Sequence, residues 1–166
     1  EALGATVSIE NGYINASADN GLVGNMVYFD VASVGATVNV ILASVLADGM
    51  TIIDNAAREP HIVDLANFFN TCGANITGAG TSMIKIRGVK ELHGCTYTII
   101  PDMIEAGTFM AAVAATGGKV TIRNIIPKHM ETVSTKLSEM GVDIDEYDDY
   151  LTVTSNGKTN GVTIKT

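Results

Sequence analysis

The sequence predicts a mixed α/β fold built from a repeated strand–helix–strand–helix–hairpin (βαβαββ) module. Two observations lead to this prediction. First, similar segments recur at intervals of about seventy residues along the chain. Second, alternating apolar runs that are typical of strands are interleaved with helical patterns of period 3.6. With 46% hydrophobic and 17% charged residues, the 166-residue chain has enough apolar side chains to bury a core.

Three glycine-centred triplets mark the repeat. After each triplet comes a run of alternating apolar and polar residues, then a turn, then a second alternating run. This pattern predicts a β-hairpin. Residues 49–55 and 118–124 also resemble each other, and each stretch predicts a strand between two helices. The triplets are Leu3-Gly4-Ala5, Cys72-Gly73-Ala74 and Met140-Gly141-Val142.

Each interval contains two helices of different character. The first is expected near residues 35–47 and again near 105–115; it has no continuous polar face, which predicts a buried helix. The second, near 61–71 and 128–139, has a one-sided apolar stripe and should cover a surface. We therefore expect buried helices at the centre with sheets outside them. A plain two-layer α/β sandwich is the alternative.

The composition excludes several classes of function. A net charge of −8, from 18 acidic and 10 basic residues, leaves no basic face for nonspecific nucleic-acid binding. A phosphate-bearing ligand must then be held by backbone N–H groups or by charges outside this chain. The sequence shows no signal peptide and no apolar run of the length that spans a bilayer, so we expect no membrane segment.

The side chains that could bind a metal ion are scattered. The three histidines have no ligand spacing, and the acidic residues 145–149 lack the glycine and the spacing of a calcium loop. Cys72 and Cys95 form no close-spaced metal or redox motif, which favours free thiols in a reducing compartment. We therefore expect neither a metal nor a cofactor.

The segment Ser33-Val34-Gly35, before the first predicted helix, is the most informative local feature. Serine is a favoured N-cap, and glycine lets a ligand approach the backbone closely. The first N–H groups of a helix are unpaired and carry partial positive charge, so this end can hold a phosphate. From the residues alone, a serine that merely caps the helix is the commoner case. At the corresponding later helix Asp102 and Glu105 predict a capping box, whose carboxylates would repel phosphate.

Four stretches of the chain resemble the UDP-N-acetylglucosamine 1-carboxyvinyltransferase family, which are enolpyruvyl transferases. The similarity runs the full length of the chain, and the motif at residues 30–35 resembles the Gram-positive branch. The resemblance implies an inside-out α/β barrel of the EPSP synthase type, with two similar domains of three βαβαββ units each. The four stretches are residues 29–37, 55–60, 78–81 and 104–109.

The resemblance also implies where this chain belongs within such an enzyme. Residues 1–100 would form the last βαβαββ unit of the domain on the UDP-sugar side, and residues 101–166 the first part of the following unit in the other domain. The chain begins without Met, which predicts an internal piece. The family's catalytic cysteine lies on a loop before residue 1, so neither Cys72 nor Cys95 takes that role. We expect no catalytic residue here, no activity of the piece alone, and apolar faces that allow self-association.

The function that the resemblance implies is transfer of the enolpyruvyl group of phosphoenolpyruvate to the 3-hydroxyl of UDP-N-acetylglucosamine. In the family this is the first committed step of peptidoglycan synthesis, a cytoplasmic reaction that serves cell wall biogenesis, cell shape and cell division. The implied partners are these two substrates, with no nucleic acid, membrane or cofactor. Two alternatives stay open: the sister enolpyruvyl transferase of the shikimate pathway, whose substrate has no nucleotide, and a non-catalytic α/β repeat module.

The resemblance further implies which residues contact the UDP portion. They are Val31, Ala32, Ser33, Val34 and Gly35. Arg58, Glu59 and His61 are candidates for the rim of the substrate cleft. From the residues alone, these three more often mark the start of a helix.

Three positions depart from the family's pattern. Many members have Lys where this chain has Val31, Glu where it has His61, and Arg where it has Met103. Without the lysine, we expect diphosphate contacts to depend on backbone N–H groups around Ser33 and Val34. The change at Met103 removes the cross-domain ion pair that an arginine there would make.

Overall fold

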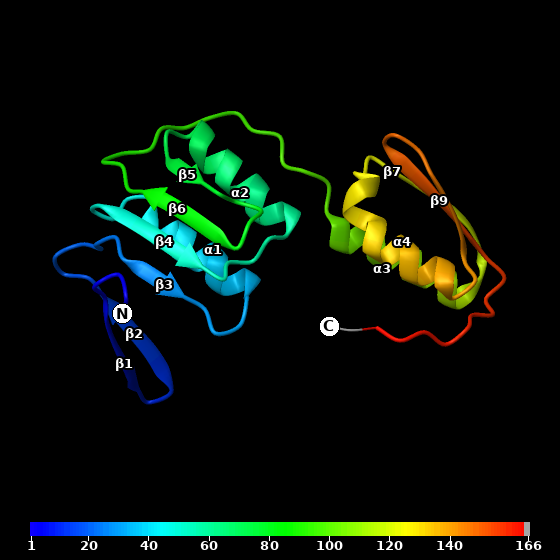
Figure 1. Ribbon diagram of the computed structural model, residues 1–166, viewed down its shortest axis with the longest axis horizontal. Coiled ribbons are helices and arrows are strands. Elements are labelled where there is room, and N and C mark those ends of the chain that lie inside the picture. The colour runs from blue at the N-terminus through cyan, green and yellow to red at the C-terminus, as the bar shows by residue number, and fades with distance from the viewer. Residues whose placement is uncertain (165–166) are drawn as a thin grey trace. The chain divides into compact units, whose positions relative to one another are not determined.

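The computed structural model describes residues 1–164 and shows two compact units, which divide between Ile99 and Ile100 (Figure 1). Each unit has its own sheet and its own hydrophobic core. No helix in the described part of the chain is long and apolar enough to cross a lipid bilayer.

The first unit contains one complete βαβαββ module after a separate two-stranded hairpin. The hairpin consists of β1 (Thr6–Glu10) and β2 (Tyr13–Ser17). The module consists of β3 (Met26–Tyr28), α1 (Val34–Ser44), β4 (Met50–Asp54), α2 (Pro60–Thr71), β5 (Asn75–Thr77) and β6 (Met83–Arg87). Its strands form one sheet in the order β3-β4-β6-β5, in which β3 is parallel to β4 and the other neighbours are antiparallel.

The second unit repeats this module from its first helix onward. Its elements are α3 (Met103–Thr116), β7 (Gly118–Arg123), α4 (Pro127–Glu139), β8 (Asp143–Glu146) and β9 (Tyr150–Ser155). The sheet order β7-β9-β8 matches β4-β6-β5, with antiparallel neighbours. Asn55 and Asn124 follow the matching strands β4 and β7 with φ of 58° and 55°, a left-handed conformation that asparagine tolerates. The predicted repeat, its helices and its hairpins are therefore confirmed.

The second unit lacks a counterpart of β3. Residues 88–102 form no helix or strand. In the first unit β4 lies between β3 and β6, whereas its counterpart β7 pairs only with β9 among the described residues. The sequences of the two modules also differ at the position that follows β3. The amide of Phe29 donates to Asp54 O at 3.2 Å, and the matching position is Pro101, which has no N–H to donate.

Each core lies between one face of the sheet and the two helices that cover it. In β6 the side chains alternate, so that Ile84 and Ile86 are fully buried and their neighbours are exposed. Burial of such a side chain contributes about 1.5–3 kcal/mol. The largest fully buried apolar side chains of the first unit are Ile41, Ile53, Ile62, Ile84 and Ile86, and those of the second are Met110, Met130, Leu151 and Val153.

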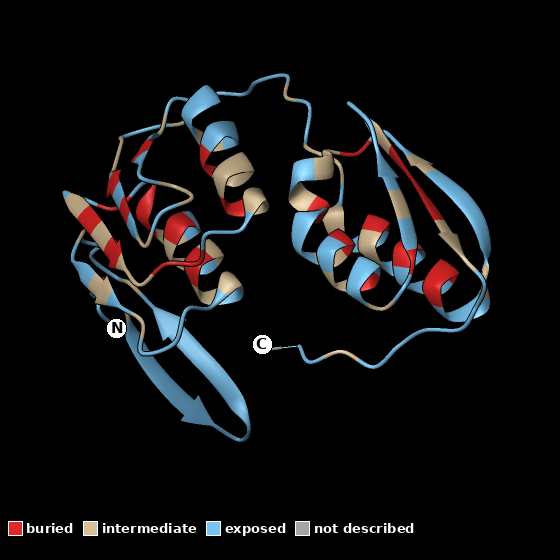
Figure 2. Ribbon diagram, turned by 45° about the vertical axis from the view of Figure 1, so that its right-hand side comes forward, coloured by how far each residue is buried: buried red, intermediate tan, exposed pale blue. Residues whose placement is uncertain are grey.

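The expectation that α1 and α3 are buried on all sides is wrong within the separate units. Leu42 of α1, Leu46 just after it, and Ile104 and Phe109 of α3 are exposed, with exposed fractions from 47% for Leu42 to 67% for Ile104. The helices of both units carry exposed as well as buried residues (Figure 2). The reason is that each unit has only two layers, so each helix packs one face against a sheet and leaves the other open. Two layers within a single unit are compatible with the predicted fold class, in which several such units come together.

Candidate functional site

The candidate binding residues lie at one edge of the sheet in the first unit. β3 leads into α1 and β4 leads into α2. Because β3 and β4 are parallel, their carboxyl ends lie at the same edge and the N-terminal ends of both helices begin there. In open α/β sheets this edge is where ligands bind. The topology therefore brings residues 31–35 and residues 58–61 to one edge.

The start of α1 presents unpaired amides to the outside. Ser33 is the N-cap, and its Oγ accepts a hydrogen bond from Ala36 N at 3.3 Å. The amides of Val34 and Gly35 have no hydrogen-bond partner within the described residues. Val31, Ala32, Ser33 and Gly35 are exposed, Val31 to 77%, and Val34 is half-buried. This arrangement can accept an anionic group, because free N–H groups and the helix dipole both favour negative charge.

Space is available directly at Gly35. A Cβ added there would have no heavy atom of the chain within 4 Å, apart from its sequence neighbours and its own helix backbone. The glycine is therefore not required by packing inside the chain. A side chain at this position would extend into open space at the start of α1.

Two hydrogen bonds hold the loop before α2 against the start of α1. The buried Thr37 Oγ1 donates to Ser33 O at 2.8 Å and accepts from Ala57 N at 3.0 Å. Asn55 Nδ2 donates to Phe29 O at 2.8 Å, which joins the ends of β3 and β4. These contacts fix the two loops relative to each other, although the sequence pattern gave no sign of the Thr37–Ala57 pair.

The three rim candidates stand at the start of α2. Arg58 and Glu59 are exposed and His61 is half-buried. Glu59 is the N-cap residue but makes no side-chain capping hydrogen bond, and Pro60 takes the first helical position. Arg58 is the one basic residue between positions 29 and 60, so it supplies the positive side chain nearest in sequence to this edge.

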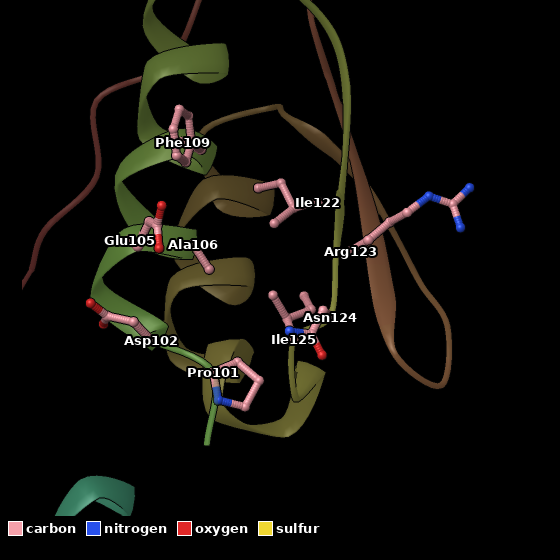
Figure 3. A pocket seen from close by; sticks show the side chains of 9 residues that line it. All are labelled: Pro101, Asp102, Glu105, Ala106, Phe109, Ile122, Arg123, Asn124 and Ile125. Carbon is pink, nitrogen blue, oxygen red and sulfur yellow. The ribbon is translucent and has the colours of Figure 1, made fainter. Parts of the chain in front are cut away.

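The matching helix start in the second unit has the opposite character. Asp102 caps α3 by accepting from Ile104 N at 2.8 Å, as predicted, but the return bond from Glu105 that would complete a capping box is not formed. Both carboxylates line a cavity of about 240 Å³ between α3 and the end of β7, and Arg123 points away from α3 (Figure 3). The acidic lining of the cavity disfavours a phosphate ligand.

The remaining candidates show one unexpected contact. In the described part of the chain, no three His, Cys, Asp or Glu side chains converge in a way that could hold a metal ion. Cys72 and Cys95 are both free, but their sulfur atoms lie 3.2 Å apart. Their separation in sequence gave no signal of this, because the contact joins the end of α2 to a segment without regular structure.

Two solved structures that share this fold are named as an enolpyruvyl transferase and an EPSP synthase. The enolpyruvyl transferase NikO from Streptomyces tendae matches with a TM-score of 0.76 and 21% identity, over 92% of this chain and 39% of that one. EPSP synthase from Acinetobacter baumannii matches with a TM-score of 0.65 and 20% identity, over 98% of this chain and 39% of that one. At these identities the likeness shows the fold: a repeated βαβαββ protein of the enolpyruvyl transferase type.

The chain belongs to the EPSP synthase (3-phosphoshikimate 1-carboxyvinyltransferase) family, which it matches over residues 1–166. Over the same 166 residues it is 61% identical to UDP-N-acetylglucosamine 1-carboxyvinyltransferase 2 of Clostridium acetobutylicum. It is 59% identical to UDP-N-acetylglucosamine 1-carboxyvinyltransferase of Clostridium botulinum. The chain spans about 40% of the length of each of these relatives.

Proposed function

We propose that this chain is part of an enzyme that transfers the enolpyruvyl group of phosphoenolpyruvate to the 3-hydroxyl of UDP-N-acetylglucosamine. The observation that carries the proposal is the 61% identity, over the whole chain, to a relative named UDP-N-acetylglucosamine 1-carboxyvinyltransferase. In this reaction the sugar oxygen adds to the enolpyruvyl carbon, the methylene carbon takes a proton, and elimination of phosphate restores the double bond. The complete enzyme would act in the cytoplasm, at the start of peptidoglycan synthesis.

The sister enzyme of the shikimate pathway is the competing assignment. It is favoured by the family description and by EPSP synthase among the solved structures, but that structural likeness comes with only 20% identity. The relatives at 57–61% identity all carry the UDP-N-acetylglucosamine name. The sugar nucleotide is therefore the acceptor that we assign.

The part of the reaction that we assign to this chain is binding of the UDP portion. The free amides of Val34 and Gly35 at the exposed start of α1 suit the diphosphate, which needs hydrogen-bond donors and positive potential. The hydroxyl of Ser33 orders these amides through its bond to Ala36 N. With Val31 in place of a lysine, Arg58 and cations elsewhere in the complete enzyme supply the remaining charge.

The identity of the acceptor is tested with the complete protein and two candidate acceptors. Phosphate release is measured with phosphoenolpyruvate and either UDP-N-acetylglucosamine or shikimate 3-phosphate. We expect turnover with the first acceptor and none with the second. Turnover with shikimate 3-phosphate alone would assign the sister reaction, and binding of neither acceptor in calorimetry would favour a non-catalytic module.

The role of the α1 start is tested by a matched pair of cap removals. Ser33→Ala and Asp102→Ala each delete the N-cap of a helix, at a typical cost of ~1 kcal/mol in stability. We expect only Ser33→Ala to weaken binding of UDP-N-acetylglucosamine, by about tenfold, since a hydrogen bond of about 1.4 kcal/mol corresponds to that factor. Equal effects of the two substitutions on binding would remove α1 from the site.

A further inference from the structure

The two cysteines of the first unit are held in contact by the fold. Cys72 Sγ and Cys95 Sγ lie 3.2 Å apart, and both thiols are free. Cys72 is buried, with 6% of its surface exposed, whereas Cys95 is exposed to solvent. A covalent S–S bond is about 2.0 Å long, so a small local movement would bring the sulfur atoms to bonding distance.

We propose that Cys72 and Cys95 form a redox-modification site, at which a small-molecule disulfide converts the dithiol into an intramolecular disulfide. The bond would join the end of α2 to residues 88–99, the segment that connects the first unit to the second. Neither the enolpyruvyl transfer nor the candidate nucleotide site uses these two residues.

The backbone on the Cys72 side is well anchored. Cys72 is the C-cap of α2, and its amide donates to Phe68 O at 3.1 Å. Gly73 follows with φ of 97°, a conformation that favours glycine. A Cβ at Gly73 would lie 3.1 Å from the ring of His93, so glycine also leaves room for the neighbouring segment.

The backbone on the Cys95 side is held at points before and after the cysteine. His93 N donates to Cys72 O at 2.9 Å. Beyond Cys95, the Tyr97 hydroxyl donates to Asp64 Oδ1 at 2.8 Å, and the Tyr97 ring meets Phe68 edge-on with centroids 5.6 Å apart. The segment therefore lies along α2 through contacts on both sides of Cys95, and the thiol contact does not depend on a free loop.

The two thiols differ in reactivity. The hydrogen bond with Cys95 raises the pKa of the Cys72 thiol, and burial adds to the effect. A thiol whose pKa is raised has less thiolate and attacks less readily. Cys95 is the thiol that an oxidant in solution can reach first, and Cys72 then acts as the resolving partner.

The chemistry is a thiol–disulfide exchange with a small-molecule disulfide, R–S–S–R, as the oxidant. The thiolate of Cys95 attacks one sulfur, forms a mixed disulfide and releases one R–S⁻. The Cys72 thiol gives its proton to solvent, and its sulfur then attacks Cys95 Sγ and displaces the second R–S⁻. Both protein thiols are oxidised, and the small-molecule disulfide is reduced to two thiols.

Peptide mapping of the complete protein tests the bond directly. The protein is treated with oxidised glutathione, remaining thiols are alkylated, and trypsin is added. Because cleavage follows Arg58, Lys85, Lys90 and Lys119, Cys72 and Cys95 fall in the separate peptides 59–85 and 91–119. We expect one cross-linked species that contains both peptides, and we expect dithiothreitol to separate them.

The control is Cys95→Ser, which changes an exposed side chain and leaves Cys72 in place. We expect this variant to give no cross-linked species. In the native wild-type protein, we expect oxidation to slow trypsin cleavage after Lys90 by about tenfold. Trypsin needs the segment around Lys90 to unfold locally, and a disulfide between Cys72 and Cys95 would make that unfolding rarer. The variant should show no such change.

Three results would overturn the proposal. The first is glutathione attached to Cys95 as a stable mixed disulfide without cross-linked peptides. The second is Cys72 and Cys95 both alkylated at the untreated rate after oxidation. The third is protection of both thiols that a chelator removes and dithiothreitol does not, which would indicate a bound metal ion instead. None of these results bears on whether the complete enzyme transfers enolpyruvyl groups.

Discussion

The hydroxyl of Thr37 accepts the amide proton of Ala57 at 3.0 Å, and so joins the first turn of α1 to the loop that leads into α2. The same hydroxyl donates to Ser33 O at 2.8 Å, which places one buried side chain behind both halves of the candidate site. Thr37 thus connects the N-terminal turn of α1 with the loop between β4 and α2.

We expect Thr37→Val to lower the free energy of unfolding by about 1–3 kcal/mol. Valine has the same shape but leaves the buried amide of Ala57 without a partner. The control is Ser44→Ala in the same helix, where the buried hydroxyl makes no hydrogen bond and its loss should have little effect. Urea unfolding of both variants gives the comparison. A Thr37→Val variant as stable as Ser44→Ala would show that the bond to Ala57 is not important for stability.

We expect Gly35→Ala to weaken binding of UDP-N-acetylglucosamine while leaving stability equal or raising it by up to ~1 kcal/mol. Alanine is a better helix residue than glycine, and the added Cβ meets no atom of the chain outside its own helix and neighbours. The control is Gly107→Ala at the corresponding position of the repeat, which lies farther inside α3 and where the Cβ would lie 3.4 Å from Met130 Cε. Calorimetry on the complete protein should show a loss of affinity for Gly35→Ala alone.

We expect Val31→Lys to increase affinity for UDP-N-acetylglucosamine by roughly fivefold at low salt. Val31 is exposed beside the start of α1, and a surface charge pair contributes about 1 kcal/mol. The gain should shrink as salt is added, because ions screen exposed charges. Val31→Gln adds length without charge and should show no gain. Unchanged affinity of Val31→Lys across salt concentrations would mean that charge at this position plays no part.

We expect the attachment of residues 88–99 to weaken at strongly alkaline pH. The hydrogen bond to Asp64 raises the pKa of Tyr97 above its usual value of 10.0. Because the folded pKa is the higher one, the contribution to stability is fully present below pH 10.0 and is lost as the pH rises through the folded value. The protection factors of this segment's amides, which compare exchange with the base-catalysed intrinsic rate, should therefore fall above pH 10.0 in the wild-type protein. In Tyr97→Phe the segment should exchange faster already at neutral pH and lack this alkaline step.

Local patterns predicted the elements of the fold well. The alternating runs and the glycine-ended helices gave both helix pairs and all three hairpins, because these signals lie within a few residues of one another. The position of residues 31–35 at an open helix start was also predictable, since a serine cap followed by glycine fixes that start. That these residues bind the UDP portion remains a prediction.

Features that depend on distant partners were not predictable in the same way. The apolar pattern around α1 could not say whether the second face of the helix would be covered; Leu42 in the helix and Leu46 just after it are exposed in this unit. The missing first strand of the second unit depends on pairing with β7, which the repeat alone does not guarantee. The contact of Cys72 with Cys95 arises from how residues 88–99 return along α2, and no local signal encodes that path.

The differing caps of α1 and α3 have an evolutionary consequence. The modules share strand order, helix order and the left-handed asparagine, which is the signature of duplication followed by divergence. Ser33 is neutral, so the positive end of the α1 dipole can still attract an anionic ligand. At α3 the carboxylate of Asp102 already neutralises the positive end of the helix dipole. The two caps also stand at different positions of the repeat, because Gly35 corresponds to Gly107 and Ser33 therefore to Glu105. Moving an anion site from α1 to α3 would thus require a later helix start as well as removal of the acidic side chains.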